Sequence, residues 1–132
     1  MSDIKYLVVH CSDSPNDRDS VDAQTIHKWH LERGWSGIGY HYVILRNGEV
    51  QHGRPDYWKG AHAKKVNDRS LGICLVGKDK FTESQFKSLK MLLLVLIKEY
   101  PYSKVRGHYD FEPNKTCPNF NVEAWWEEAK ND

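Results

Sequence analysis

Three side chains in this sequence are suited to binding a metal ion. His10, His108 and Cys117 supply imidazole and thiolate groups, the two ligand types that zinc prefers, and each lies where a strand-like segment meets a loop. A structural zinc site normally has four protein ligands, whereas a catalytic site has three and leaves one position for water or substrate. Three ligands therefore predict a site that carries out chemistry.

Other residues compete for the same role. The spacing is weak evidence by itself, because no short zinc-finger pattern is present, and the chain has seven histidines. His27 and His30 lie three residues apart, on neighbouring parts of one helix face. Cys11 competes with His10, because successive side chains of a strand point to opposite faces. The residues alone leave these alternatives open.

Strand-like and helix-like segments alternate along the chain. Apolar runs predict strands at residues 5–12, 40–46, 49–51, 71–76 and 104–108. Asn47-Gly48 joins the second and third of these and favours the positive φ angles of a tight hairpin turn. The mostly polar stretch 51–70 predicts a long surface loop, a kind of segment that is usually functional or disordered.

Capping residues predict three helices. The expected N-caps are Asp22, Thr82 and Asn121. The first helix is expected over about 23–33 and stops at Gly34, while the second begins with a capping box to Gln85 and closes at Pro101. Its broad apolar sector over 86–100 predicts a helix that is largely buried against a sheet. These elements predict an α/β fold with a central mixed sheet of about five strands packed by about three helices.

Length and composition restrict the possible functions. The 132 residues suffice for one domain, expected over 1–132. With Lys+Arg 19 against Asp+Glu 18 and no basic stripe, nucleic acid is not an expected partner. The longest apolar stretch, 91–97, is too short to cross a bilayer, so no membrane insertion is expected. Three cysteines suggest reduced thiols, and residues 1–5 lack the features of a secretory signal, which predicts synthesis in the cytosol.

Several short segments resemble the zinc-dependent N-acetylmuramoyl-L-alanine amidases. They are Tyr6-Leu7-Val8-Val9-His10, Gly39-Tyr40-His41-Tyr42, Gly60-Ala61-His62-Ala63, Gly107-His108 and Lys115-Thr116-Cys117-Pro118. The chain is similar to the amidase type 2 or peptidoglycan-recognition-protein-like family, in particular to its short single-domain bacteriophage lysozymes, over nearly its whole length. The resemblance implies one zinc ion per chain, held by His10, His108 and Cys117, and it selects His10 over Cys11.

The resemblance also implies a reaction. The expected substrate is peptidoglycan, and the bond to be cut joins the lactyl carbonyl of N-acetylmuramic acid to the L-alanine of the stem peptide. Tyr40, chosen over Tyr42 by the Gly-Tyr-His motif, is expected to orient the attacking water and relay a proton. Lys115 lies two residues before a ligand and is expected to stabilise the tetrahedral oxyanion. His62 is expected to contact the substrate.

Two further functions are compatible with parts of the pattern. A non-catalytic peptidoglycan-binding module has the same fold, but such relatives typically lack the cysteine that this chain has at position 117. A structural zinc module needs a fourth protein ligand to exclude water. The expected biological role is that of an endolysin, a monomer that stays in the host cytoplasm until a membrane lesion admits it to the cell wall.

Overall fold

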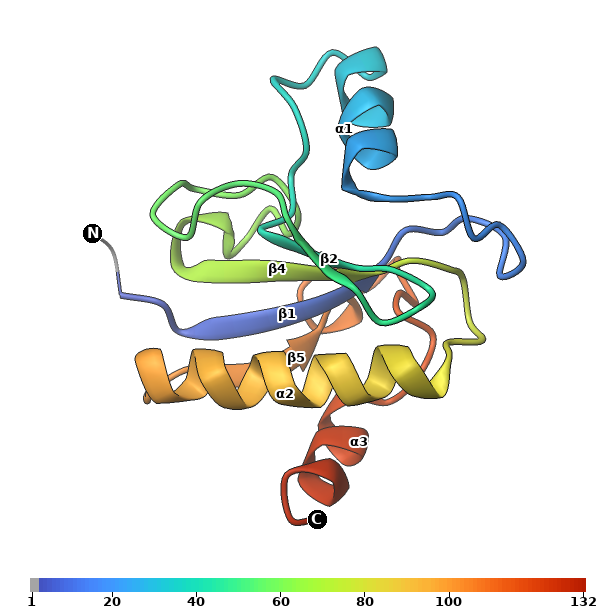
Figure 1. The fold of residues 1–132 in the computed structure, drawn as a ribbon. Coiled ribbons are helices and arrows are strands. Elements are labelled where there is room, and N and C mark those ends of the chain that lie inside the picture. The colour runs from blue at the N-terminus through green and yellow to red at the C-terminus, as the bar shows by residue number, and fades with distance from the viewer. Residues whose placement is uncertain (1–2) are drawn as a thin grey trace.

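One mixed sheet of five strands forms the centre of the molecule (Figure 1). The computed structural model describes residues 3–132. The strands are β1 (Tyr6–Cys11), β2 (Tyr42–Ile44), β3 (Val50–His52), β4 (Ser70–Leu75) and β5 (Lys104–Gly107). Their order is β3-β2-β4-β1-β5, in which β1 is parallel to β4 and β5, β2 is parallel to β4, and β3 is antiparallel to β2. The predicted mixed sheet is confirmed.

Helices cover both faces of this sheet (Figure 1). They are α1 (Ala23–Glu32), α2 (Glu83–Glu99) and α3 (Val122–Ala129). The alternation of side chains along β1 explains the two layers. Leu7 and Val9 pack in the cluster that includes α2 and α3, whereas Val8 packs on the opposite side with Ala63 and Val66 of the long loop. The predicted α/β class with three helices is therefore confirmed.

The helices begin where the sequence predicts. The hydroxyl of Thr82 accepts a hydrogen bond from the Gln85 amide at 3.0 Å, and the Gln85 side chain accepts one from the Thr82 amide at 2.9 Å, which completes the capping box. The side chains of Asp22 and Asn121 cap α1 and α3 in the same way as acceptors. Gly34 has a φ of +87°, a left-handed conformation that glycine adopts without strain. No helix in residues 3–132 is long and apolar enough to span a membrane.

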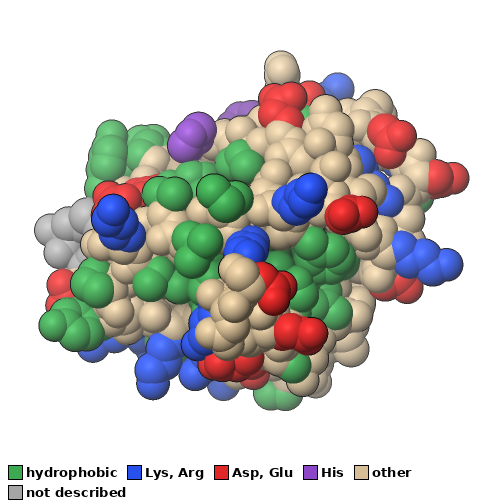
Figure 2. Space-filling model, turned by 60° about the horizontal axis from the view of Figure 1, so that its bottom comes forward, with side chains coloured by type: hydrophobic (Ala, Val, Ile, Leu, Met, Phe, Trp, Pro, Cys, Tyr) green, Lys and Arg blue, Asp and Glu red, His purple; other side chains and the backbone are tan. Residues whose placement is uncertain are grey.

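The expectation that α2 is largely buried is wrong for part of its apolar sector. Met91, Leu94 and Val95 are 61%, 42% and 60% exposed, and hydrophobic side chains lie among charged ones on this side of the molecule (Figure 2). The sheet contacts one stripe of the helix, which includes Leu89 and Leu93. A helix is round and the sheet covers one side of it, so the rest of a broad apolar sector stays at the surface.

The hairpin is also shorter than predicted. Strand β2 begins at Tyr42, so Tyr40 precedes the strand instead of belonging to it. The connection to β3 is longer than a two-residue turn, and Gly48, with a φ of +92°, is its one residue in the left-handed region. The long loop that follows β3 includes a short 3-10 helix, Asn67–Arg69.

Candidate active site

The carboxyl ends of β1 and β5 bring the three predicted ligands together. Because these strands are parallel, they end at the same edge of the sheet. His10 lies at the end of β1, His108 directly follows β5, and Cys117 lies in the loop before α3. The potential ligand atoms of the three side chains all lie within 4.8 Å of one another. Residues separated by about a hundred positions thus form one cluster of two imidazoles and a thiol.

His10 forms the floor of this cluster. Its side chain is 1% exposed, and its ring centroid lies 4.3 Å from that of His108. Burial, helped by the two neighbouring imidazoles His62 and His108, lowers the pKa of His10 well below its usual value. The ring is therefore neutral near pH 7, which is the form that binds metal.

Cys117 receives a hydrogen bond from the main chain of β1. The Cys11 amide donates to Cys117 Sγ at 2.8 Å, a contact that favours negative charge on the sulfur. Interaction with the neighbouring Cys11 thiol, together with burial, nevertheless raises the pKa of Cys117, so the proton must leave when a metal binds. Cys11 is buried as expected, but its amide contributes to the site. All three cysteines are free, as predicted.

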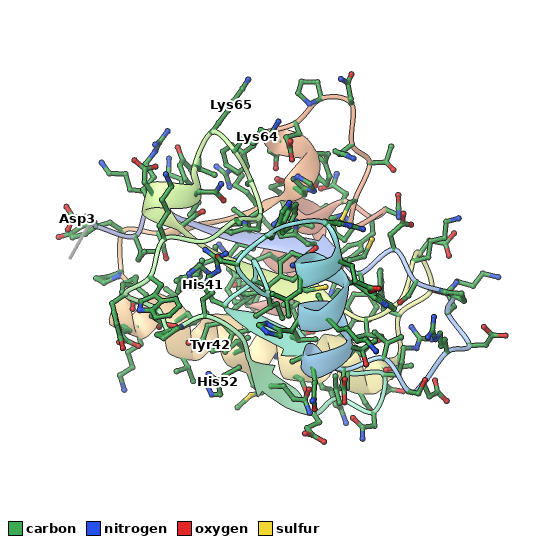
Figure 3. The ribbon with its side chains drawn as sticks, turned by 90° about the horizontal axis from the view of Figure 1, so that it is seen from above. Asp3, His41, Tyr42, His52, Lys64 and Lys65 are labelled. Atoms are coloured by element: carbon green, nitrogen blue, oxygen red, sulfur yellow. The ribbon has the colours of Figure 1, made fainter. Side chains whose placement is uncertain are left out.

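A cavity of about 720 Å³ opens beside the cluster, a size typical of ligand sites. The predicted ligands His108 and Cys117 line it, and so do the three other predicted site residues, Tyr40, His62 and Lys115. Lys64 lies on its rim, on the outer side of the long loop next to Lys65 (Figure 3). The structure therefore brings all six predicted site residues to one place.

Tyr40 and Tyr42, which periodicity could not separate, point to different environments. The ring of Tyr40 lines the cavity with its centroid 5.1 Å from that of His10. The hydroxyl of Tyr42 donates to Asp56 at 2.7 Å, and its ring belongs to the core on the α2 side; Figure 3 shows Tyr42 at the β2–β3 edge beside His52. Burial raises the pKa of Tyr40, so its phenol stays protonated and is able to donate a hydrogen bond.

His62 is buried and uses both ring nitrogens. Nδ1 lies 2.8 Å from Nε2 of His10, and Nε2 lies 3.1 Å from the hydroxyl of Ser70. Burial, with His41 and His108 nearby, lowers the pKa of His62 to about 3. A substrate contact is thus restricted to the ring edge at the cavity, and it stays a prediction.

Lys115 lies at the mouth of the cavity. Its side chain is exposed, and its amide donates to the Glu112 carbonyl at 2.8 Å, which fixes the loop before Cys117. An exposed ammonium group in this place is free to approach a bound substrate. The catalytic roles of Lys115 and Tyr40 stay predictions.

The competing histidines have structural partners. Nδ1 of His27 and Nδ1 of His30 accept hydrogen bonds, both at 3.0 Å, from amides of the segment after α1. His41 is buried, accepts a hydrogen bond from the Gly72 amide and lies 2.8 Å from the Trp58 carbonyl. Among the described residues, none of these three rings belongs to a cluster of metal-binding groups.

The sequence interpretation missed two groups next to the ligands. Nε2 of His108 is hydrogen-bonded to the carboxylate of Glu112, and Ser70 contacts His62 from β4. The four-residue separation of His108 and Glu112 is a signal that the sequence does contain, because such pairs meet on one turn of chain. The contact between Ser70 and His62 has no corresponding pattern in the local sequence.

Solved structures with a similar fold include N-acetylmuramoyl-L-alanine amidases and peptidoglycan recognition proteins. The endolysin N-acetylmuramoyl-L-alanine amidase LysCS from Clostridium intestinale URNW superimposes with a TM-score of 0.84 and 32% identity, over 98% of this chain and 82% of that chain. The fold and the site together define an amide-hydrolysing enzyme.

Sequence comparison identifies the family. The model of the N-acetylmuramoyl-L-alanine amidase family matches residues 1–120. The endolysin of Enterobacteria phage T3 is 42% identical over 92% of this chain and 84% of its own length. The endolysin of Escherichia phage T7 is 40% identical over the same shares. The chain therefore belongs to the N-acetylmuramoyl-L-alanine amidase family.

Proposed function

We propose that this protein is a zinc-dependent N-acetylmuramoyl-L-alanine amidase that cleaves peptidoglycan between the lactyl carbonyl of N-acetylmuramic acid and the L-alanine of the stem peptide. Family membership supports the reaction. The observation that carries the proposal is the cluster of two imidazoles and one thiol, within 4.8 Å, beside a cavity of substrate size.

The donor set fits zinc. Two nitrogens and one sulfur are typical zinc ligands, and a three-ligand site leaves a position for water or substrate, as catalysis requires. His10, His108 and Cys117 would hold the zinc ion, which would supply a Lewis acid to polarise the scissile carbonyl and to make water nucleophilic near neutral pH. In residues 3–132 the cluster has three members and no fourth, which favours a catalytic site over a structural zinc module.

The chain supplies two groups for the remaining steps. In this proposal the protonated phenol of Tyr40 donates a hydrogen bond that orients the attacking water or the carbonyl oxygen; its position at the cavity beside His10 supports that role. The Lys115 ammonium approaches from the cavity mouth and stabilises the negative charge of the tetrahedral oxygen. The attacking water releases a proton and the departing amine of L-alanine takes one up; we assign Tyr40 to this relay, in which the phenol gives its proton to the amine and regains one from the water.

The biological role follows from the relatives. Endolysins from four phages match at 38–42% identity over most of the chain. We therefore propose that this protein is a phage endolysin, a monomer made in the host cytoplasm that acts on the wall once the membrane has been permeabilised.

The test is digestion of purified peptidoglycan followed by mass spectrometry. We expect free stem peptides with new amino termini and intact glycan strands, activity that a chelator abolishes and zinc restores, and about one zinc per chain. Cys117→Ala should lose zinc and activity. Cys74→Ala, which removes a thiol buried in the sheet, is the matched control and should keep both.

Three results would contradict the proposal. New reducing ends would indicate a glycosidase, and full zinc content in Cys117→Ala would exclude this ligand set. Binding to peptidoglycan without release of peptide, in a zinc-loaded sample, would instead support the non-catalytic module.

A further inference from the structure

A buried series of hydrogen bonds leads from the ligand cluster into the sheet. His10 Nε2 lies 2.8 Å from His62 Nδ1, His62 Nε2 lies 3.1 Å from Ser70 Oγ, and Ser70 Oγ lies 2.6 Å from the Val66 carbonyl. His10, His62 and Ser70 are 1%, 8% and 2% exposed. Solvent therefore does not compete for these contacts, and each polar atom depends on its protein partner.

The direction of each bond follows from the end of the series. A carbonyl oxygen only accepts, so Ser70 donates its single proton to Val66 and can only accept from His62. His62 Nε2 therefore carries a proton. A neutral imidazole has one donor and one acceptor, so His62 Nδ1 accepts from Nε2–H of His10. The lone pair of His10 is then on Nδ1, the one ring nitrogen left for a cation.

We infer that His62 is a positioning residue that fixes the tautomer and the orientation of His10, so that His10 binds the metal through Nδ1. This inference rests on the proposed zinc site. Metal-binding histidines commonly donate their other N–H to an outer acceptor, which orients the ring and makes the ligand more basic. Here the acceptor is a second, neutral imidazole, and Ser70 sets its tautomer in turn.

The surroundings of His62 hold its ring in place. Asn67 Oδ1 accepts hydrogen bonds from the amides of His62 and Ala63, both at 2.8 Å, which anchors the loop. A Cβ atom added at Gly60 or Gly72 would lie 2.6 Å from a ring carbon of His62. The ring thus packs directly on two glycine backbones, where any side chain would displace it.

The second imidazole ligand has a comparable outer contact. Nε2 of His108 is hydrogen-bonded to the Glu112 carboxylate, and an ionised carboxylate only accepts. His108 therefore also keeps Nδ1 free. The two ligands differ in the acceptor that orients them: a carboxylate on the exposed side of the site and a neutral imidazole on the buried side.

The first test identifies the tautomer directly in the zinc-loaded, unaltered protein. Long-range ¹H–¹⁵N NMR spectra of the imidazole rings distinguish a protonated from a metal-bound nitrogen. We expect the proton of His10 on Nε2 and the metal on Nδ1. A proton on Nδ1 of His10 would overturn the inference, whatever the behaviour of the variants.

The second test measures zinc affinity by competition with a chelator, with folding checked by circular dichroism. His62→Leu removes the acceptor and should weaken zinc binding about 10- to 100-fold. His62→Asn places an amide oxygen near the position of Nδ1 and should restore most of the affinity. Ser70→Ala should cause a smaller loss. Ser88→Ala, whose hydroxyl donates to the Gly48 carbonyl on the α2 side, is the matched control and should leave affinity unchanged.

The outcomes separate this inference from the proposed function. Failure of the unaltered protein to bind zinc would overturn both. Tight zinc binding that His62→Leu leaves unchanged would overturn only the role of His62. If His62→Leu does not fold, the NMR experiment and Ser70→Ala decide.

Discussion

Two tyrosines that are two residues apart show how the neighbours of a side chain determine its role. Tyr40 lies before β2 and lines the cavity, whereas Tyr42 belongs to the strand and donates its hydroxyl to Asp56. The phenols have the same intrinsic chemistry. Of the two, Tyr40 is the one that lies close enough to reach a substrate bound beside His10. Replacement of each tyrosine by phenylalanine should therefore affect catalysis and stability differently.

We predict that Tyr40→Phe keeps its fold and its zinc but loses catalytic rate. The hydroxyl is not among the ligands, and removal of a donor to developing charge costs about 100-fold or more in kcat. Tyr42→Phe is the matched control: it should lower the free energy of unfolding by about 1 kcal/mol and leave kcat nearly unchanged. Peptide release from peptidoglycan measures both, and equal rates for Tyr40→Phe and the unaltered protein would remove Tyr40 from the mechanism.

The predictable part of the site consists of residues with a distinctive local context. His10, His108 and Cys117 were found through short motifs at strand ends, and the structure brings them together. The contacts of His62 were not found, because they depend on Ser70 and Gly72 of strand β4, which packs against the loop that carries His62. Which ring nitrogen faces the ligand cluster is a property of three-dimensional packing that no spacing in the sequence contains.

The two faces of the sheet contribute to different properties of the protein, one to the site and the other to the main core. The site, α1 and the long loop lie on one side, and α2 with α3 forms the main core on the other. Helix α2 makes its contacts through residues such as Leu89 and Leu93 and does not line the cavity. Stability and catalysis should therefore respond separately to changes in α2.

We predict that Thr82→Ala lowers the free energy of unfolding by about 1 kcal/mol, because it removes the N-cap of α2. Activity of the folded protein should not change, since α2 lies across the sheet from the site. Ser84→Ala, at an exposed position in the same turn, is the control and should cost nothing. Urea denaturation and a peptide-release assay at 25 °C measure the two quantities. A loss of kcat comparable to that of Tyr40→Phe would show that the two faces are coupled.

Elements were more predictable than their arrangement. The caps at Thr82 and Asn121 depend on hydrogen bonds within one turn, so the sequence locates them well. Strand order depends on pairing over long distances, such as β1 with β5, which local patterns do not encode. The exposure of Met91 and Val95 was missed because the apolar width of a helix does not reveal how much of it a sheet covers.

Several histidine side chains are buried in the interior of the molecule, and their imidazoles are neutral near pH 7. His10, His30, His41 and His62 are all buried, and burial lowers the pKa of each; the pKa of His30 falls to about 4 and that of His62 to about 3. An unfolded histidine has a pKa of about 6.5. Below that pH the unfolded chain binds protons that the folded chain does not, so acid favours unfolding.

We predict that the metal-free protein becomes less stable as the pH falls from about 6.5 toward 4. Each buried imidazole contributes a loss of about 1.4 kcal/mol per pH unit below 6.5, so the free energy of unfolding should fall by several kcal/mol between pH 7 and pH 5. Urea denaturation in the presence of a chelator measures this dependence.

One pair of variants assigns the effect to burial. His30→Asn keeps an acceptor near the Gly39 amide but cannot take up a proton, so its slope against pH should be smaller by about one proton. His52→Asn, at an exposed position, should leave the slope unchanged. A free energy of unfolding that stays constant between pH 7 and pH 5 would mean that the buried imidazoles are protonated in the folded protein.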